Sequence, residues 1–251
     1  MLNNPCYLIK LVFNFYNALT NPSLYLVPNF IGEFSKDYLP PRTIEKIYTI
    51  RHFIVEREKT ARAFLKAIGH PTPQDEFVCI ELNKHDNYSG FKLFFDQYIN
   101  DFPIGVLSEA GLPAIADPGH EVVRYAHAKQ VRVVPLSGSS SLFLALMASG
   151  FNGQNFQFNG YLPIDSKDRI LALKDMEYRA RKTTQIFMEA PYRNNAFLEF
   201  LIKNLQHSTQ LCVAVDLEKE EKETIISKPI RDWKPKEIEL HKKPCIYIIA
   251  G

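Results

Sequence analysis

The 251-residue sequence lacks the short motifs that mark the commonest nucleotide and hydrolase sites. It contains no G-x-G-x-x-G, no G-x-x-x-x-G-K-[ST] and no G-x-S-x-G segment. These absences argue against an ordinary dinucleotide Rossmann site, a phosphate-binding P-loop and a nucleophile elbow. The seven histidines show no metal-ligand spacing, so we predict no metal site.

The sequence also has little net charge, and its cysteines are not spaced in pairs. The net charge is only +2, so composition alone does not argue for a nucleic-acid partner or an acidic membrane surface. Three of the four cysteines lie in apolar, strand-like runs, and none has a partner at a metal-binding spacing. This pattern predicts buried free thiols in a reducing cytosol, and therefore a cytoplasmic protein. The cysteines are Cys6, Cys79, Cys212 and Cys245.

No long apolar run is present near the start of the chain. Residues 6–19 are apolar but are interrupted by Lys10, Asn14 and Asn17, without a basic leader or a small-residue cleavage site. We expect residues 1–22 to form an N-terminal extension. We expect neither a targeting signal nor a membrane span there.

Glycine, by contrast, is concentrated in one region. Seven of the eleven glycines lie between residues 105 and 160. Within that region two apolar strand-like runs, 104–107 and 131–136, each lead into a loop of small residues. Ligands of parallel α/β sheets bind at the carboxyl ends of strands, where small side chains let a ligand reach the main chain. The pattern therefore predicts a small-molecule site.

Strand-like and helix-like patterns alternate along most of the chain, which predicts an α/β fold with a parallel or mixed sheet. A charged turn at 218–223 predicts an antiparallel hairpin. We expect an N-terminal α/β domain over 23–137, a C-terminal α/β domain over 138–251, and a cofactor cleft between them. Strands are expected at 24–28, 52–55, 77–82, 104–107, 131–136, 156–161, 184–188, 211–215, 224–227 and 245–250, and helices at 40–50, 59–68, 91–99, 119–129, 142–148, 168–181 and 195–205.

Six segments resemble, in the same order, those of one known family. They are L-Y-L-V-P-N-F-I-G (24–32), S-E-A-G-L-P-A-I-A-D-P-G (108–119), V-V-P-L-S-G-S-S-S (133–141), A-L-M-A-S-G (145–150), F-N-G-Y-L-P (158–163) and I-F-M-E-A-P-Y-R (186–193). Their counterparts are L-Y-x-V-P-T-P-I-G, S-D-A-G-T-P-x-x-x-D-P-G, V-V-P-L-P-G-P-S-A, A-L-x-A-S-G, F-x-G-F-L-P and I-F-Y-E-S-P-H-R. These belong to the bacterial small-subunit ribosomal RNA methyltransferase I family, within the tetrapyrrole methylase superfamily.

The resemblance covers roughly residues 24–251 and implies the tetrapyrrole methylase fold, usually a homodimer, with S-adenosylmethionine in the cleft. It also implies methylation of a cytidine ribose 2′-hydroxyl, with ribosomal RNA or the small ribosomal subunit as partner. Because the cofactor carries its own activated methyl group, the protein must align the acceptor and exclude water. By position, the cofactor contacts would be Pro28, Ser108, Glu109, Ala110, Gly111, Ile115, Ser140, Met188, Ala214 and Pro244.

The polar residues at the other expected cleft positions each allow two interpretations. Glu56 or Glu189 could be the base that takes the proton of an attacking hydroxyl. Either could instead form an ion pair with Arg62 or Arg193, which are the candidate substrate-binding residues. A basic set on one helix and its end is either an RNA contact or a solvated helix face. That set comprises Lys167, Arg169, Arg179, Arg181 and Lys182.

Three residues of the small-residue loops are also open to a structural interpretation. Glu109 could accept hydrogen bonds from the cofactor or could only shape its loop. Asp117, before Pro-Gly, could contact a ligand or form a turn. Ser140 could contact the cofactor or cap a helix.

The chain departs from the family pattern mainly on the acceptor side. The family segment A-E-D-T-R-H-T-R reads V-E-R-E-K-T-A-R at 55–62, and Glu109, Leu112 and Tyr192 replace Asp, Thr and His. The sequence stops at the last expected strand, without the C-terminal helical segment of the family. Two further functions therefore stay open, namely methylation of a tetrapyrrole or other small acceptor, and S-adenosylmethionine binding without methyl transfer.

Overall fold

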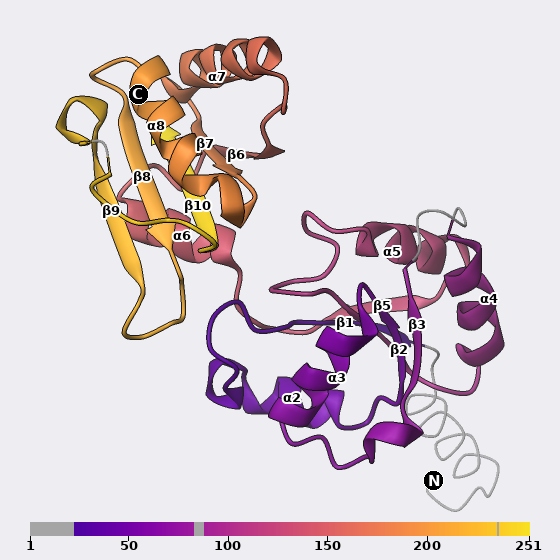
Figure 1. Cartoon of the computed structure of the whole chain (residues 1–251). Coiled ribbons are helices and arrows are strands. Elements are labelled where there is room, and N and C mark those ends of the chain that lie inside the picture. Colours follow the sequence, from indigo (N-terminus) through magenta and orange to yellow (C-terminus); the bar gives the residue numbers. More distant parts are fainter. Residues whose placement is uncertain (1–22, 83–87, 235) are drawn as a thin grey trace, which may run out of the picture. The chain divides into compact units, whose positions relative to one another are not determined.

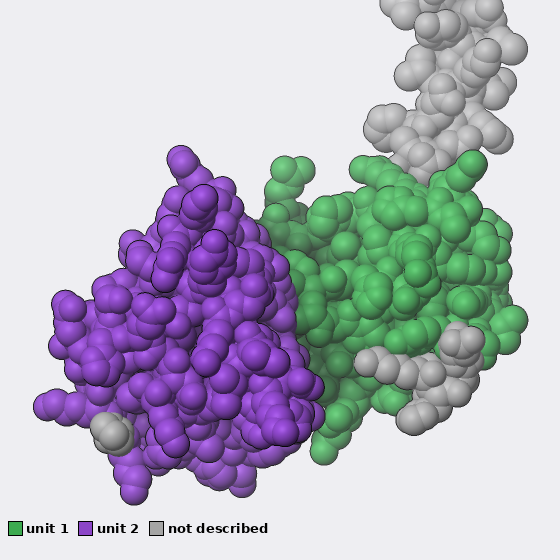
Figure 2. Space-filling model, turned by 90° about the horizontal axis from the view of Figure 1, so that it is seen from above, with its two compact units in different colours: residues 1–30, 34–139 green, residues 31–33, 140–251 purple. Residues whose placement is uncertain are grey.

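The computed structural model describes residues 23–82, 88–234 and 236–251. The extension expected over residues 1–22, with Cys6, lies outside them. The described residues divide into two compact units (Figure 2). Unit 1 comprises residues 23–30 and 34–139, and unit 2 comprises residues 31–33 and 140–251. The domain boundary that the sequence suggested after residue 137 stays a prediction, and so does the cofactor cleft.

Unit 1 is a five-stranded parallel sheet with helices on both faces (Figure 1). Its strands are β1 (Ser23–Val27), β2 (His52–Val55), β3 (Val78–Glu81), β4 (Ile104–Leu107) and β5 (Arg132–Pro135), and its helices are α2 (Pro41–Ile47), α3 (Glu58–Ala67), α4 (Ser89–Tyr98) and α5 (Gly119–Ala128). The strand order is β3-β2-β4-β1-β5, and every neighbouring pair is parallel. All five carboxyl ends therefore lie at one end of the sheet.

Strand alternation decides which helix packs on which face of this sheet. In β2, Phe53 points into the cluster formed with α2 and α3, while Ile54 points into the cluster formed with α4 and α5. Phe64 of α3 and Phe95 of α4 are fully buried on these two faces. Burying one such ring contributes about 1.5–3 kcal/mol, so the two layers hold the strand ends in place.

Unit 2 is a mixed five-stranded sheet in the order β6-β7-β10-β8-β9. Its strands are β6 (Phe156–Tyr161), β7 (Thr184–Met188), β8 (Gln210–Val215), β9 (Thr224–Pro229) and β10 (Cys245–Ala250), and its helices are α6 (Ser141–Ser149), α7 (Ser166–Ala180) and α8 (Asn194–Asn204). Among the described strand pairs, β6 and β7 are parallel and the other three are antiparallel. Helices α7 and α8 cover one face and α6 covers the other (Figure 1).

The predicted α/β class with two units is confirmed, and so is the hairpin, in which β8 and β9 pair antiparallel from Val215 and Thr224 outward. Every helix and strand expected from the sequence is present, with ends shifted by three residues at most. The sequence did not predict the four short 3-10 helices at Lys36–Tyr38, Gln74–Glu76, Pro191–Arg193 and Ile230–Asp232. Within the described ranges no helix is long and apolar enough to cross a membrane.

Candidate active site

Asn29, the second residue after β1, joins two strand-end loops of unit 1. Its buried side-chain amide donates to the main-chain oxygens of Ser108, at 2.9 Å, and Glu109, at 3.0 Å. Its own N–H donates to the oxygen of Gly111 at 2.8 Å. The loop after β4 is therefore attached directly to the end of β1. The sequence did not single out Asn29, although a polar residue directly after a buried strand and proline was a usable signal.

Glu56 and Glu109 join the loops after β2 and β4. The Glu56 carboxylate accepts a hydrogen bond from the main-chain N–H of Glu109 at 3.2 Å. The Glu109 carboxylate accepts one from the Thr60 hydroxyl at 3.1 Å and lies 3.3 Å from Nε of Arg57. The Glu109 side chain is about 39% exposed. It therefore shapes the loop and still presents its carboxylate to solvent, and its role as a cofactor contact stays a prediction.

The loop after β5 packs tightly against the end of β1. A Cβ atom built on Gly138 would lie 2.2 Å from Cβ of the buried Pro28, so only glycine fits there. The Thr43 hydroxyl of α2 donates to the oxygen of Ser137 at 2.9 Å and holds the same loop from its other side. The loops after β1, β2, β4 and β5 thus form one connected surface at the carboxyl end of the sheet.

Asp117 forms the turn that leads into α5. Its Oδ1 accepts hydrogen bonds from the N–H groups of Ala114, at 2.9 Å, and Gly119, at 2.6 Å. Burial raises the pKa of this carboxyl group, and its Oδ2 is buried with no hydrogen-bond partner among the described residues. Ala114 and Ala116 adopt left-handed conformations with φ of 69° and 64°. Such strain, about 1–3 kcal/mol per residue, is typical of functional loops.

The structure brings most of the predicted cofactor contacts of unit 1 to this surface. Ser108 is buried, and its hydroxyl donates to the oxygen of Ala110 at 3.1 Å. Ala110 is exposed, and Gly111 turns the chain with a φ of 67°. Ile115 lies farther along the same loop and is exposed. Their role as cofactor contacts stays a prediction.

The remaining predicted contacts belong to unit 2. Met188 ends β7 and is half-buried, while the side chain of Ala214 is buried in the cluster between β8 and α6. Pro244 is exposed, and its oxygen accepts from the N–H of Asp216 at 3.1 Å. Ser140 occupies the N-cap position of α6, but its side chain makes no capping hydrogen bond. The capping role that the sequence allowed is thus not seen in its contacts.

Glu189 and Arg193 form an ion pair just after β7. The Glu189 side chain is only 1% exposed, and its Oε1 accepts from Nε of Arg193 at 2.9 Å and from the N–H of Ala190 at 2.7 Å. This hydrogen bond raises the pKa of Arg193. The ring of Tyr192 lies 5.2 Å from the same guanidinium group. This is the ion pair that the sequence left as the alternative to catalysis.

Arg62 is engaged within unit 1 by neighbours other than Glu56. Its Nε donates to Glu58 at 2.7 Å, and its Nη1 donates to the oxygen of Gln74. The guanidinium group therefore holds the segment before β3 against α3. Substrate binding by Arg62 and Arg193 stays a prediction.

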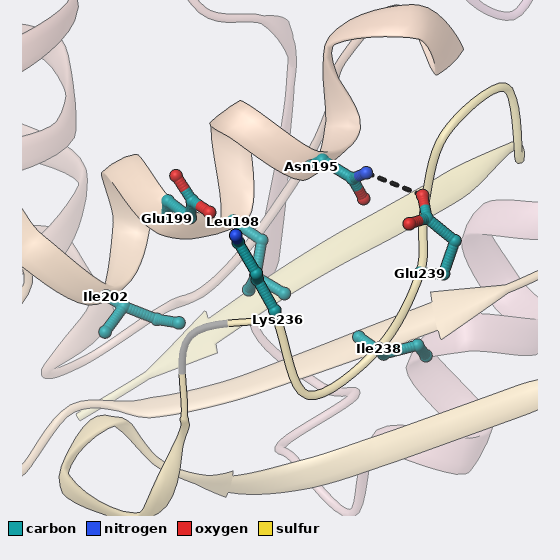
Figure 3. Close-up of a pocket in the computed structure, with 7 residues that line it drawn as sticks. All are labelled: Asn195, Leu198, Glu199, Ile202, Lys236, Ile238 and Glu239. Atoms are coloured by element: carbon teal, nitrogen blue, oxygen red, sulfur yellow. Dashed lines mark hydrogen bonds between the residues drawn. The ribbon is translucent and has the colours of Figure 1, made fainter.

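A pocket elsewhere on unit 2 contains none of the predicted site residues. It lies between α8 and the segment before β10, where Lys236 points toward Glu199 (Figure 3). Asn195 bridges its two sides by donating to Glu239 at 2.6 Å. Its lining is of mixed charge. No group of three or more potential metal ligands occurs among the residues that the structure describes.

Comparison with solved structures defines the class of fold. The chain matches the methyltransferase CobJ with a TM-score of 0.59 at 14% identity, over 91% of this chain and 93% of that one. It matches the uroporphyrin III C-methyltransferase of Thermus thermophilus with a TM-score of 0.56 at 15% identity, over 91% of this chain and 97% of that one. The chain therefore has the two-domain tetrapyrrole methylase fold that the resemblance implied.

Comparison with curated relatives gives the family. The chain is 33% identical to the ribosomal RNA small subunit methyltransferase I of Halalkalibacterium halodurans over 171 residues, 68% of this chain and 56% of that protein. It is 30% identical to the enzyme of that name from Synechocystis over 196 residues, 78% of this chain and 67% of that protein. The chain belongs to the ribosomal RNA small subunit methyltransferase I family. No protein-family model matches it.

Proposed function

We propose that this protein is an S-adenosylmethionine-dependent methyltransferase that methylates a cytidine ribose 2′-hydroxyl in small-subunit ribosomal RNA. The main observation in support of this proposal is the connected surface at the carboxyl end of the unit 1 sheet. Two of the segments that resemble the family, 24–32 and 108–119, meet there through Asn29. The match covers only 56% of the ribosomal RNA small subunit methyltransferase I of Halalkalibacterium halodurans, so the activity of the whole protein is part of the proposal.

The chemistry of this surface fits the cofactor. Ala110 is exposed and has only a methyl side chain, so a ligand can approach the main chain there, and the Glu109 carboxylate can accept hydrogen bonds from hydroxyl or amino groups. When bound, S-adenosylmethionine supplies a methyl group on a positively charged sulfur. The residues of the chain then have to orient the acceptor and exclude water. The proposed cofactor contacts also include four residues of unit 2, namely Ser140, Met188, Ala214 and Pro244.

Glu56 and Glu189 are the proposed candidates for the base. A general base of this kind contributes about 10²–10⁴-fold in rate, so Glu56→Gln and Glu189→Gln separate the two. Loss of turnover with unchanged stability identifies the base. Because Glu189 is buried against Arg193, a structural role for Glu189 predicts loss of stability in Glu189→Gln instead.

The decisive test is methyl transfer from labelled S-adenosylmethionine to small ribosomal subunits from a host that lacks its own methyltransferase I. We expect label on the ribose of a single cytidine. Calorimetric cofactor binding without label would reject the RNA assignment and favour a tetrapyrrole, another small acceptor, or binding without turnover. Absence of cofactor binding would overturn the proposal as a whole.

The proposal includes a homodimer, as the family resemblance implies, and a cytoplasmic location, as the unpaired cysteines suggest. Sedimentation of the purified full chain at micromolar concentration tests the first part. A single species at the mass of one chain, 28.9 kDa, would contradict it. Fractionation of cells of the source organism tests the second.

A further inference from the structure

A basic pocket lies on unit 2 where α7 ends beside the edge strand β6. It has a volume of about 360 Å³ and is lined by Gln157, Tyr178, Arg179, Arg181, Lys182 and Thr183. None of the residues proposed for cofactor, base or substrate lines it. Three of its lining residues are cations within four consecutive positions, and they belong to the basic set that the sequence left open.

Arg179 is fixed as one wall of this pocket. Its Nη2 pairs with Asp175 at 2.9 Å, and its Nη1 donates to Gln157 of β6 at 2.5 Å. Its Nε is buried and has no hydrogen-bond partner within the described residues. The guanidinium group is thus held rigidly across the gap between α7 and β6. One N–H donor in it is left unsatisfied.

The two neighbouring cations leave the pocket with excess positive charge. Arg181 and Lys182 are exposed, and neither forms an ion pair with any residue in the described ranges. Asp175 forms an ion pair with Arg179 and so neutralises the charge of that residue alone. A polyanion that reaches the pocket would therefore meet two neighbouring cations that have no carboxylate partner among the described residues, which is the arrangement that binds consecutive phosphates.

An exposed aromatic ring accompanies these cations. Tyr178 is 70% exposed, and the Arg181 guanidinium lies 5.5 Å from its ring centroid. A ring of this kind on a helix surface loses apolar hydration when a flat group stacks on it. Aromatic rings interleaved with cations are the chemistry that binds single-stranded nucleic acid, because bases stack while phosphates pair.

We propose that this pocket binds the backbone of single-stranded RNA, with phosphates on Arg181 and Lys182 and one base stacked on Tyr178. The inference rests on the proposed function, since it assigns an RNA contact to the same protein. It adds a contact surface that includes neither carboxylate proposed as the base, since residues 178–183 precede β7 and Glu189 follows it. A double-stranded RNA would present paired bases that cannot stack on a single side chain, so the pocket selects an unpaired segment.

The test measures binding of the full chain to a fluorescein-labelled single-stranded RNA oligonucleotide by anisotropy over a range of salt concentrations. Arg181→Gln with Lys182→Gln should weaken binding and should lower the slope of log K against log salt by about 0.7 for each phosphate that the variant no longer neutralises. Tyr178→Ala should weaken binding about fivefold to a hundredfold and leave the slope unchanged, while Tyr178→Phe should bind like the wild type.

The matched control replaces two exposed lysines elsewhere on unit 2, Lys203→Gln with Lys222→Gln, which removes the same charge. Equal weakening in this control and in the pocket variant would overturn the proposal. Equal effects on an RNA duplex would overturn the single-strand assignment. Cofactor binding should be unchanged in all variants, which shows that they fold. A wild-type protein that binds cofactor but no RNA would reject the RNA function itself and the pocket with it.

Discussion

His52 is a buried ionisable group at the amino end of β2. Its ring lies 4.5 Å from the ring centroids of both Tyr98 and Phe102, and its Nδ1 has no hydrogen-bond partner among the described residues. Burial, assisted by the charge of Arg51, lowers its pKa below the ordinary 6.5. Burial likewise lowers the pKa of His70. The fold therefore favours the neutral form of both rings.

The first prediction concerns the pH dependence of stability. Because the folded-state pKa is lowered, the unfolded chain binds protons first as pH falls below 6.5, and folding stability decreases from there toward the folded-state pKa. His52→Phe should reduce this decrease, leaving the part due to His70. Urea unfolding at pH 7.5, 6.5 and 5.5 measures how the free energy of unfolding changes with pH in each variant. The exposed His127→Ala serves as control, and an unchanged pH dependence in His52→Phe would refute the argument.

A second prediction at this scale separates the two roles of Glu109. Glu109→Ala should lower S-adenosylmethionine affinity about 10–100-fold, since a hydrogen bond to a charged group is worth about 1.5–3 kcal/mol. Thr60→Val removes one loop contact of Glu109 but keeps the carboxylate, so its affinity should stay close to wild type. Calorimetry measures both variants. Equal reductions in affinity would show that Glu109 acts only through loop geometry.

At the scale of elements, the site depends on contacts between loops rather than on any one loop. Asn29→Ala leaves the oxygens of Ser108 and Glu109 without this donor. We expect a loss of about 1–3 kcal/mol in unfolding free energy, together with weaker cofactor binding. Asn29→Asp should cost more, because a carboxylate would face two carbonyl oxygens. Urea unfolding measures both, and wild-type stability in both variants would contradict the proposed role.

The packing of the loop after β5 gives a matched pair of glycine variants. Gly138→Ala places a methyl group against Pro28 and should destabilise the protein by about 1–3 kcal/mol. In Gly153→Ala the nearest atom lies 3.9 Å away, so the change should be neutral or slightly stabilising. Thermal unfolding compares the two. Similar melting temperatures would mean that the loop moves aside without cost.

How far these elements can be predicted depends on the range of their contacts. The β8–β9 hairpin followed from a local charged turn, and the helix expected at 91–99 is present as α4. The strand order β3-β2-β4-β1-β5 arises from long-range pairing, which no local pattern contains. The local sequence marks Asn29 only as a polar residue after a strand, and its role was not predicted because its partners lie 79 and 80 residues along the chain.

At the scale of the whole molecule, each of the four buried apolar clusters lies within a single unit. The described cysteines lie in both units: Cys79 belongs to unit 1, and Cys212 and Cys245 belong to unit 2. Burial raises their pKa values to about 11, about 11 and about 12, respectively. All three are free thiols, as the sequence predicted, although Cys79 is only half-buried.

These thiols should therefore resist alkylation in the folded protein. At pH 8 we expect labelling in a Cys6→Ser background to be about a hundredfold slower for Cys79 and Cys212 than for a free cysteine, and about a thousandfold slower for Cys245, because the thiolate is the reacting form. In urea, mass spectrometry of the labelled peptides should show which unit opens at which concentration. Rapid labelling of Cys212 or Cys245 in buffer would show that β8 or β10 is not packed as described.

The contacts between the strand-end loops also determine which residues of this site can be substituted without disturbing the sheet. Arg57 and Thr60 reach Glu109 through their side chains, while the main chain of Glu56 continues the ladder by donating to Leu107 at 3.1 Å. Substitutions at 57–60 can therefore alter the polar lining of the loop without disturbing the sheet. This is the segment in which the chain departs most from its family. Under the proposed function, the acceptor could therefore change through this segment while the ties between the loops after β1 and β4 stay as they are.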